Sequence, residues 1–140
     1  SKSWYLRNKN NIAIKQLKNN LVNFFLNKRN SKSSENLWTT FADFKKILSG
    51  KGYGRAFVPI NMRASNKYRE RTSIAYPVNR YINTGVKNFF IKHGVEIDED
   101  GFATSEMLQF IWRSAIRRGA AVSLYLPSAR MRKLLLDWLG

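Results

Sequence analysis

Residues 37–60 read LWTTFADFKKILSGKGYGRAFVPI, and this stretch gives the strongest indication of the fold. Residues 37–41 are short, aromatic and β-branched, which predicts a strand. Residues 42–48 fit a short helix, and the glycines between 50 and 54 end it. Residues 56–60 predict a second strand, in which Pro59 suits an edge position or a bulge because proline cannot donate to a strand ladder. The stretch therefore predicts a strand–helix–strand unit.

The flanking sequence continues this alternation. Apolar residues at steps of three and four predict helices over residues 10–28 and 78–92. A further helix is predicted from Thr104, as its N-cap, to about Arg118, where Gly119 ends it. Residues 122–126 predict a third strand, and Pro127-Ser128 then opens a last helix over residues 129–139.

Strands that alternate with helices predict an α/β fold with a small, mainly parallel sheet and flanking helices. Three strands are few, so the sheet has room for one that the pattern does not reveal. A chain of 140 residues fits one domain. We expect a single basic α/β domain over residues 1–140, in which a helix and polar loop at 10–35 lead into a sheet core at 36–139.

The charge of the chain is strongly positive. There are 25 Lys and Arg against 9 Asp and Glu, a net charge of +16, and five of the nine acids fall between Glu96 and Glu106. A field of this size attracts polyanions, and we expect a nucleic-acid partner, either DNA or RNA. A solubilising surface and a surface that docks on an acidic protein are the alternatives.

Several kinds of site are excluded by composition. There are no cysteines, which removes disulfides, Cys-based zinc sites and thiol nucleophiles. His93 is the only histidine, so histidine metal sites and Ser-His-Asp triads lack material, and we expect no bound metal. The acids at 96–100 do not have EF-hand spacing. No Gly-x-x-x-x-Gly-Lys-Ser/Thr phosphate loop is present.

The compartment is predicted from the same features. No apolar run approaches the length needed to span a bilayer, so no membrane partner is expected. The absence of cysteine fits a cytoplasmic protein, in the host cell if the protein is viral. The chain starts Ser-Lys-Ser-Trp without Met, which indicates a processed terminus or an excised fragment.

Residues 109–117 give the most informative candidate site. On a continuous helix, Gln109, Arg113 and Arg117 fall at four-residue steps and share one face. One glutamine and two guanidinium groups suit an array of phosphate oxygens, since guanidinium binds them through two parallel hydrogen bonds. An amphipathic helix with a solvated basic face is the alternative.

Two further candidate groups follow predicted strands. The hydroxyls of Thr39 and Thr40 come at the end of the first strand and can contact a nucleic-acid backbone. The loop after residue 60 puts polar donors at the carboxyl end of the second, where open α/β sheets bind ligands. A buried strand with satisfied hydroxyls and an ordinary basic loop are the alternatives. The candidate loop residues are Asn61, Arg63, Ser65, Asn66 and Lys67.

In this order, residues 38–41, 61–66 and 109–117 resemble the second, C-terminal RecA-like lobe of superfamily-two helicases, most closely the divergent type of phages and mobile elements. In that family the first landmark touches the nucleic-acid backbone, and the second contacts both nucleic acid and nucleotide. The third is a Gln/Arg helix that supplies arginine fingers to ATP held by the first lobe. The resemblance spans about residues 10–139 and implies a RecA-like lobe that is catalytically incomplete alone.

Carried over by position, Gln109 would sense the nucleotide, and Arg113 and Arg117 would be the candidate fingers. The sequence departs from the family in two places: Ile116 stands where the second arginine is usual, and the 61–66 loop has no glycine. The phosphate loop and the metal-binding acids belong to the first lobe. ATP is therefore expected only where a first lobe is present, and none is expected on this chain alone.

Three hypotheses follow from the sequence. The first is the nucleic-acid-binding lobe of an ATP-dependent DNA or RNA helicase, acting with a first RecA-like lobe. The second is a stand-alone nucleic-acid-binding or regulatory module without ATPase activity. The third is an adaptor that docks on an acidic protein. Salt-dependent binding to nucleic acid separates the first two from the third.

Overall fold

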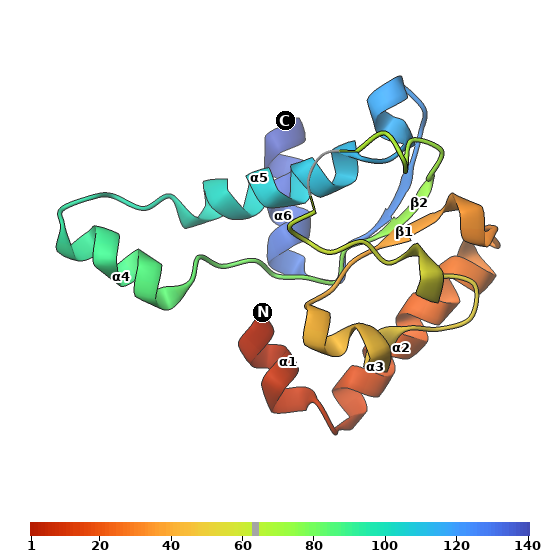
Figure 1. Cartoon of the computed structure of the whole chain (residues 1–140), viewed down its shortest axis with the longest axis horizontal. Coiled ribbons are helices and arrows are strands. Elements are labelled where there is room, and N and C mark those ends of the chain that lie inside the picture. Colours follow the sequence, from red (N-terminus) through yellow and green to blue (C-terminus); the bar gives the residue numbers. More distant parts are fainter. Residues whose placement is uncertain (63–64) are drawn as a thin grey trace.

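A sheet of three parallel strands forms the centre of the computed structural model, which describes residues 1–62 and 65–140 (Figure 1). The strands β1 (Asn36–Trp38), β2 (Ser73–Ala75) and β3 (Ser123–Tyr125) lie side by side in chain order. The central strand β2 pairs with both neighbours in parallel. The prediction of an α/β fold with a small parallel sheet and flanking helices is confirmed.

One face of the sheet packs on the N-terminal helices. Trp38 and Ala75 belong to the core on this face, together with Leu21, Phe25 and Tyr53. The Trp38 ring is fully buried, and its indole N–H donates to the carbonyl oxygen of Tyr53 over 2.8 Å. The elements on this side are α1 (Lys2–Asn8), α2 (Ile12–Val22), the π-helix η1 (Asn23–Lys28), the 3₁₀ turn η3 (Ala42–Phe44) and α3 (Lys45–Leu48).

The other face packs on α5 (Glu99–Trp112) and α6 (Ala129–Leu139). Leu37 and Ile74 belong to the core on this face, together with Met107 of α5. Neighbouring strand residues thus enter opposite cores, as the alternation of side chains along a strand requires. The molecule is a three-layered stack of helices, sheet and helices, in which β1 and β2 are apolar on both sides.

The prediction of a strand at residues 56–60 was wrong in part. The short 3₁₀ helix η4 (Gly54–Ala56) comes first, and then Phe57 makes a single parallel bridge with Trp38. The N–H of Val58 donates to the carbonyl oxygen of Trp38 over 2.9 Å. Pro59 follows and has no N–H with which to extend the ladder. The segment therefore lies at the edge outside β1, as Pro59 predicted, without becoming a strand.

The strand that the pattern did not reveal is β2. It reads Ser-Ile-Ala, so Ile74 is its only large apolar side chain, and the polar loop before it gives no strand signal. All three residues are buried because β2 is central and covered on both faces. Small residues can fill such a strand because the flanking helices supply the apolar volume.

Two of the predicted helices are confirmed, and one begins later than predicted. Residues 10–28 contain α2, which continues into η1, and residues 129–139 form α6 with Ser128 as its N-cap. The helix predicted at 78–92 is α4 (Thr84–Lys92). Asn83 starts it, since its side chain accepts hydrogen bonds from the N–H groups of Gly85 and Val86.

The helix predicted from Thr104 to about Arg118 is divided differently. Its N-cap is Asp98, six residues before the predicted Thr104, and the Asp98 side chain accepts from the N–H of Gly101 over 2.9 Å. It ends at Trp112 and is followed by a separate 3₁₀ helix, η5 (Ala115–Arg118). Gly119, with φ of 84°, ends η5 in the left-handed conformation that glycine tolerates.

Helix α4 projects from the rest of the molecule, to the left in Figure 1. None of its residues, all of which the structure describes, is buried, and the Phe89 side chain is 57% exposed. An ion pair between Lys87 and Glu99 ties α4 to the start of α5. No helix in the described parts of the chain is both long and apolar enough to cross a membrane.

Candidate nucleic-acid interface

The loop predicted at the carboxyl end of a strand instead leads to the amino end of one. From Ser65 onward it runs into β2, and Asn66 and Lys67 are exposed on it. Asn61 is also exposed, just after the edge segment at Phe57. Arg63, the one arginine predicted in this loop, lies outside the described residues. The prediction placed this loop at the carboxyl end of a strand over residues 56–60, and these residues do not form that strand.

Gln109, Arg113 and Arg117 do not share one helix face. Ser114 interrupts the helix: its hydroxyl donates to the carbonyl oxygen of Ile111 and accepts from the N–H of Ile116 in η5. Gln109 is exposed and donates to the Ser105 hydroxyl, Arg113 is buried, and Arg117 is exposed on η5. The four-residue spacing therefore did not hold, because the hydroxyl of Ser114 caps a new 3₁₀ turn.

The predicted loop and the segment after α5 nevertheless meet. The N–H of Ala115 donates to the carbonyl oxygen of Arg71 over 2.9 Å. Arg118 donates to the carbonyl oxygen of Arg69 over 3.0 Å and forms an exposed ion pair with Glu70 at 3.3 Å. The chain before β2 and the helix η5 are thus joined side by side at the amino edge of the sheet.

A third segment joins them from the N-terminal helices. Arg29, directly after η1, donates to the Ser73 hydroxyl at the start of β2 over 3.1 Å. Arg71 donates to the carbonyl oxygen of Ser33 over 2.9 Å, in the 3₁₀ turn η2 (Ser33–Glu35) that precedes β1. Segments more than eighty residues apart in sequence therefore converge on one edge.

We call the basic side chains of these three segments the amino-edge surface. The same segments contain only two acids, Glu35 and Glu70, and the Glu35 carboxylate accepts from the N–H of Lys32 in the local turn. Positive charge is therefore concentrated at this edge beyond the average of an already basic chain. The amino-edge surface consists of Lys28, Arg29, Lys32, Lys67, Arg69, Arg71, Arg117 and Arg118.

Arg113 is the C-cap of α5, two residues before the Ala115 N–H that donates to Arg71. It is only 7% exposed, and its Nε and Nη1 atoms find no hydrogen-bond partner among the described residues. Burial lowers the pKa of its guanidinium, and the nearby Glu106 and Tyr68 act in the opposite direction. Arginine keeps its proton in proteins, so the donors that the described residues leave unpaired need another acceptor.

Residues 1–139 match the family model described as the YonV C-terminal Rossmann-like domain. The chain belongs to this family. The SPbeta prophage-derived uncharacterized protein YonV of Bacillus subtilis (strain 168) is 49% identical over 139 residues, which make up 99% of this chain and 33% of that protein. The chain thus spans about a third of the relative's length. No solved structure shows a significant match.

The YonV C-terminal Rossmann-like description agrees with the three-layered parallel architecture, which is also that expected of a RecA-like lobe. In the structure, the predicted residues Thr39 and Thr40 come directly after β1, at the carboxyl edge of the sheet. Both are buried, at 0% and 1% exposed, and their hydroxyls have no partner among the described residues. In this conformation a nucleic-acid backbone reaches neither of them.

Tyr76 is a further buried polar group, and it was not predicted from the sequence. It follows β2 and is fully buried, and its hydroxyl has no partner in residues 1–62 and 65–140. Burial raises its pKa, while the charges of Arg80 and Arg113 lower it and that of Glu106 raises it. Tyr76 packs on Phe110, so it belongs to the α5 side of the sheet with Arg113.

The arginines of the amino-edge surface were also missed as a group. Each lies in a polar stretch that reads as an ordinary loop, and only the sheet brings the stretches together. The dense basic runs at 28–32 and 67–71 were the available signal. Among the described residues there is no cluster of three or more His, Cys, Asp or Glu that could hold a metal ion.

Proposed function

We propose that this Rossmann-like domain binds the sugar–phosphate backbone of DNA or RNA through the amino-edge surface. The observation that carries the proposal is the convergence of three basic segments, with two acids among them, at one edge of the sheet. Such a surface neutralises several phosphates at once and releases their counterions. Binding of this kind is independent of base sequence.

The side chains of this surface divide into two roles. Arg71 and Arg118 each donate one hydrogen bond to a backbone carbonyl oxygen, which orients the guanidinium group. Each guanidinium has further N–H donors that can bind phosphate oxygens. Lys67 and Arg117 are exposed, and no hydrogen bond or ion pair from either side chain is found within residues 1–62 and 65–140. They are free to follow a phosphate backbone.

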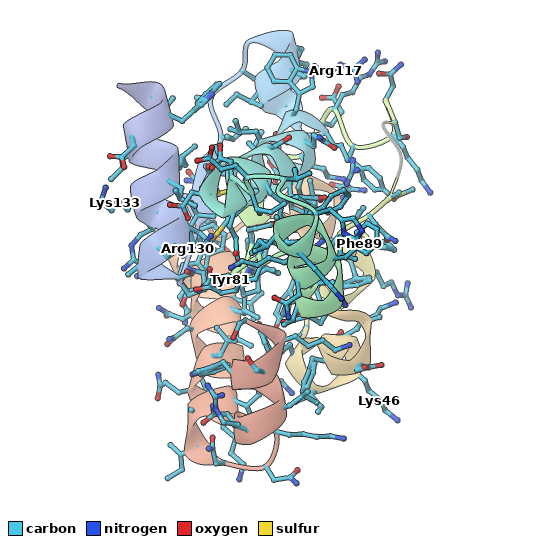
Figure 2. The ribbon with its side chains drawn as sticks, turned by 90° about the vertical axis from the view of Figure 1, so that its left-hand side faces the viewer. Lys46, Tyr81, Phe89, Arg117, Arg130 and Lys133 are labelled. Atoms are coloured by element: carbon cyan, nitrogen blue, oxygen red, sulfur yellow. The ribbon has the colours of Figure 1, made fainter. Side chains whose placement is uncertain are left out.

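The test is fluorescence anisotropy with labelled single- and double-stranded DNA and RNA over a salt series. We expect affinity to fall steeply as salt rises, and Arg117→Ala to reduce the slope of log K against log salt by about 0.9. Lys46→Ala is the matched control, since Lys46 lies at the opposite end of the molecule (Figure 2). An absence of binding at low salt would reject the proposal and favour docking on an acidic protein.

The finer form of this proposal is a helicase. In it, the chain is the second RecA-like lobe, ATP is held by a first lobe, and Gln109, Arg113 and Arg117 act at that nucleotide. The order of the three landmarks favours it, and two thirds of the prophage relative lie outside the match and leave room for a first lobe. Neither the family description nor the relative's name mentions a helicase.

Two features of the site argue against the helicase form of the proposal. A finger must reach across an interlobe cleft, whereas Arg113 is buried and Arg117 lies on η5, a helix separate from α5. Its test is ATP hydrolysis by a longer protein in which this chain accompanies a nucleotide-binding lobe. Arg113→Lys should lower nucleic-acid-stimulated hydrolysis there. A longer protein without ATPase activity would reject the helicase and retain backbone binding by a module.

A further inference from the structure

A cavity of about 510 Å³ opens at the opposite, carboxyl edge of the sheet. Its walls come from α1, α2, the ends of β2 and β3, and the start of α6. The volume lies in the range of small-molecule sites, and the carboxyl ends of parallel strands are where open α/β sheets hold their ligands. None of the amino-edge residues lines it.

The lining has a definite chemical character. Three aromatic rings and three side-chain amides are among the lining residues, and among the described residues that line the cavity none is acidic. Such walls suit a planar ring with hydrogen-bonding edges, and they place no negative charge against an anionic group. The residues that define this character are Trp4, Arg7, Gln16, Asn20, Asn79 and Tyr125.

Contacts behind the walls hold these side chains in place. Trp4 packs edge-to-face on Tyr5, whose hydroxyl donates to the carbonyl oxygen of Pro77 just after β2. Tyr125 stacks on Phe24 with ring centroids 5.5 Å apart. A site whose side chains are already ordered loses less entropy when a ligand binds.

Polar groups of the cavity are oriented in the same way. Gln16 donates to Asn20 over 2.9 Å, and the Asn79 side-chain oxygen accepts from Arg130 over 2.7 Å. Arg130 also donates to the carbonyl oxygen of Arg80 and contacts the Tyr81 ring, 4.3 Å from its centroid (Figure 2). The amides are thereby fixed with known donor and acceptor directions.

Basic side chains lie at and behind the cavity wall, although Arg130 is also ion-paired with Asp100 at 2.9 Å. Arg7 lines it, and Arg130 stands behind Asn79. Ser128, the N-cap of α6, lies at the rim, so the positive end of that helix dipole adds to the same field.

We propose that the carboxyl-edge cavity binds a nucleotide, with its base among Trp4, Tyr125 and the amides and its phosphate toward Arg7. The site is independent of the amino-edge surface, and it departs from the sequence-based expectation that this chain alone binds no nucleotide. The base supplies the planar ring that the aromatic walls accept. The phosphate supplies the anion that the field favours.

The experiment is isothermal titration calorimetry with AMP, GMP, CMP and UMP, and with adenosine and inorganic phosphate as partial ligands. We expect at least one nucleotide to bind with a Kd below about 1 mM. The matching nucleoside and inorganic phosphate should each bind about tenfold more weakly or worse, because each keeps only half of the contacts.

Three variants place the binding in the cavity. Arg7→Gln should weaken the nucleotide about tenfold, whereas Lys9→Gln, a control of equal charge that does not line the cavity, should leave affinity unchanged. Ala13→Trp fills the cavity and should abolish binding, with circular dichroism confirming that the variant folds. Gln16→Trp is the second filling variant if Ala13→Trp does not fold.

Two results would overturn the cavity site. One is the lack of saturable binding by all four nucleotides up to a few millimolar. The other is binding that survives Arg7→Gln and a filling variant but is lost in Arg117→Ala, since the nucleotide would then sit on the amino-edge surface. Neither result depends on the outcome of the nucleic-acid experiment, because that experiment tests the amino-edge surface and not the cavity.

Discussion

The two edges of the sheet differ in how they present polar groups. The amino-edge surface is open and made of charged side chains from three distant segments, with Arg71 and Arg118 as its fixed points. The carboxyl edge is hollow and made of aromatic rings and amides held by contacts behind them. An open charged edge suits an extended polyanion, and a hollow aromatic edge suits a small ligand. One short sheet thus presents two chemistries.

The largest effect is expected where both edges depend on the same residue. Trp38→Ala removes a fully buried indole and its hydrogen bond to Tyr53, and should lower the free energy of unfolding by about 3–5 kcal/mol. Urea denaturation measures it. If both edges share one core, nucleic-acid and nucleotide binding should be lost together, and retention of either would show that its edge folds independently.

The next effect separates the edges. Replacing Lys67, Arg69 and Arg117 together by Ala removes three exposed charges from the amino-edge surface, and nucleic-acid affinity near 0.1 M salt should fall by about several hundredfold. Lys9, Lys15 and Lys46 are exposed elsewhere, so their replacement by Ala is a control of equal charge. Equal losses in the two triple variants would mean that net charge, rather than this edge, binds the polymer.

Arg113 tests whether the amino edge is built for an anion at the expense of stability. Arg113→Met replaces a buried guanidinium, two of whose nitrogens have no partner in the described parts of the chain, by an apolar side chain. It should raise the free energy of unfolding by about 1–3 kcal/mol while weakening nucleic-acid binding. Urea titrations with and without sulfate measure it, and sulfate should stabilise the parent more than the variant. A destabilised variant would assign Arg113 a purely structural role.

A smaller effect is confined to the carboxyl edge. Ser128→Ala removes the side chain that accepts from the N–H of Met131 at the start of α6, and should cost about 1 kcal/mol of stability. Thermal unfolding followed by circular dichroism measures it. Nucleic-acid affinity should not change, and a loss there would show that the two edges are coupled through α6.

The smallest effect is expected outside both edges. Phe89 on α4 is 57% exposed, so Phe89→Ser should change the free energy of unfolding by less than about 0.5 kcal/mol. Binding at both edges should be unaffected. A substantial loss of stability would mean that α4 packs on the body more closely than its exposure indicates.

The layers of the fold were predictable from sequence, and the central strand was not. Residues 37–41 and 122–126 carry enough aromatic and branched side chains to signal β1 and β3. By contrast β2 is short and mostly small, because its burial is supplied by neighbouring helices rather than by its own side chains. A hydrophobic pattern depends on the apolar side chains of the segment itself. A buried strand with few large apolar side chains therefore gives no recognisable pattern.

The candidate site was predicted in its parts but not in its arrangement. Arg113, Arg117 and Lys67 were named from sequence, and they do belong to segments that meet. The four-residue spacing failed at Ser114, whose hydroxyl competes for backbone hydrogen bonds and ends α5. Contributions from Arg29 and Arg71 depend on tertiary contacts between remote segments, which no local pattern contains.

The projecting helix α4 has a practical consequence. No residue of α4, which the structure describes completely, is buried, and the turn after it reaches Gly94, where an added side chain would meet open space. Exposed turns of this kind are where proteases cut first and where inserted sequences are accepted. A tag or a fluorescent label introduced next to Gly94 would report on the protein while both sheet edges stay intact, and a nick there would leave the two halves joined through β2 and β3.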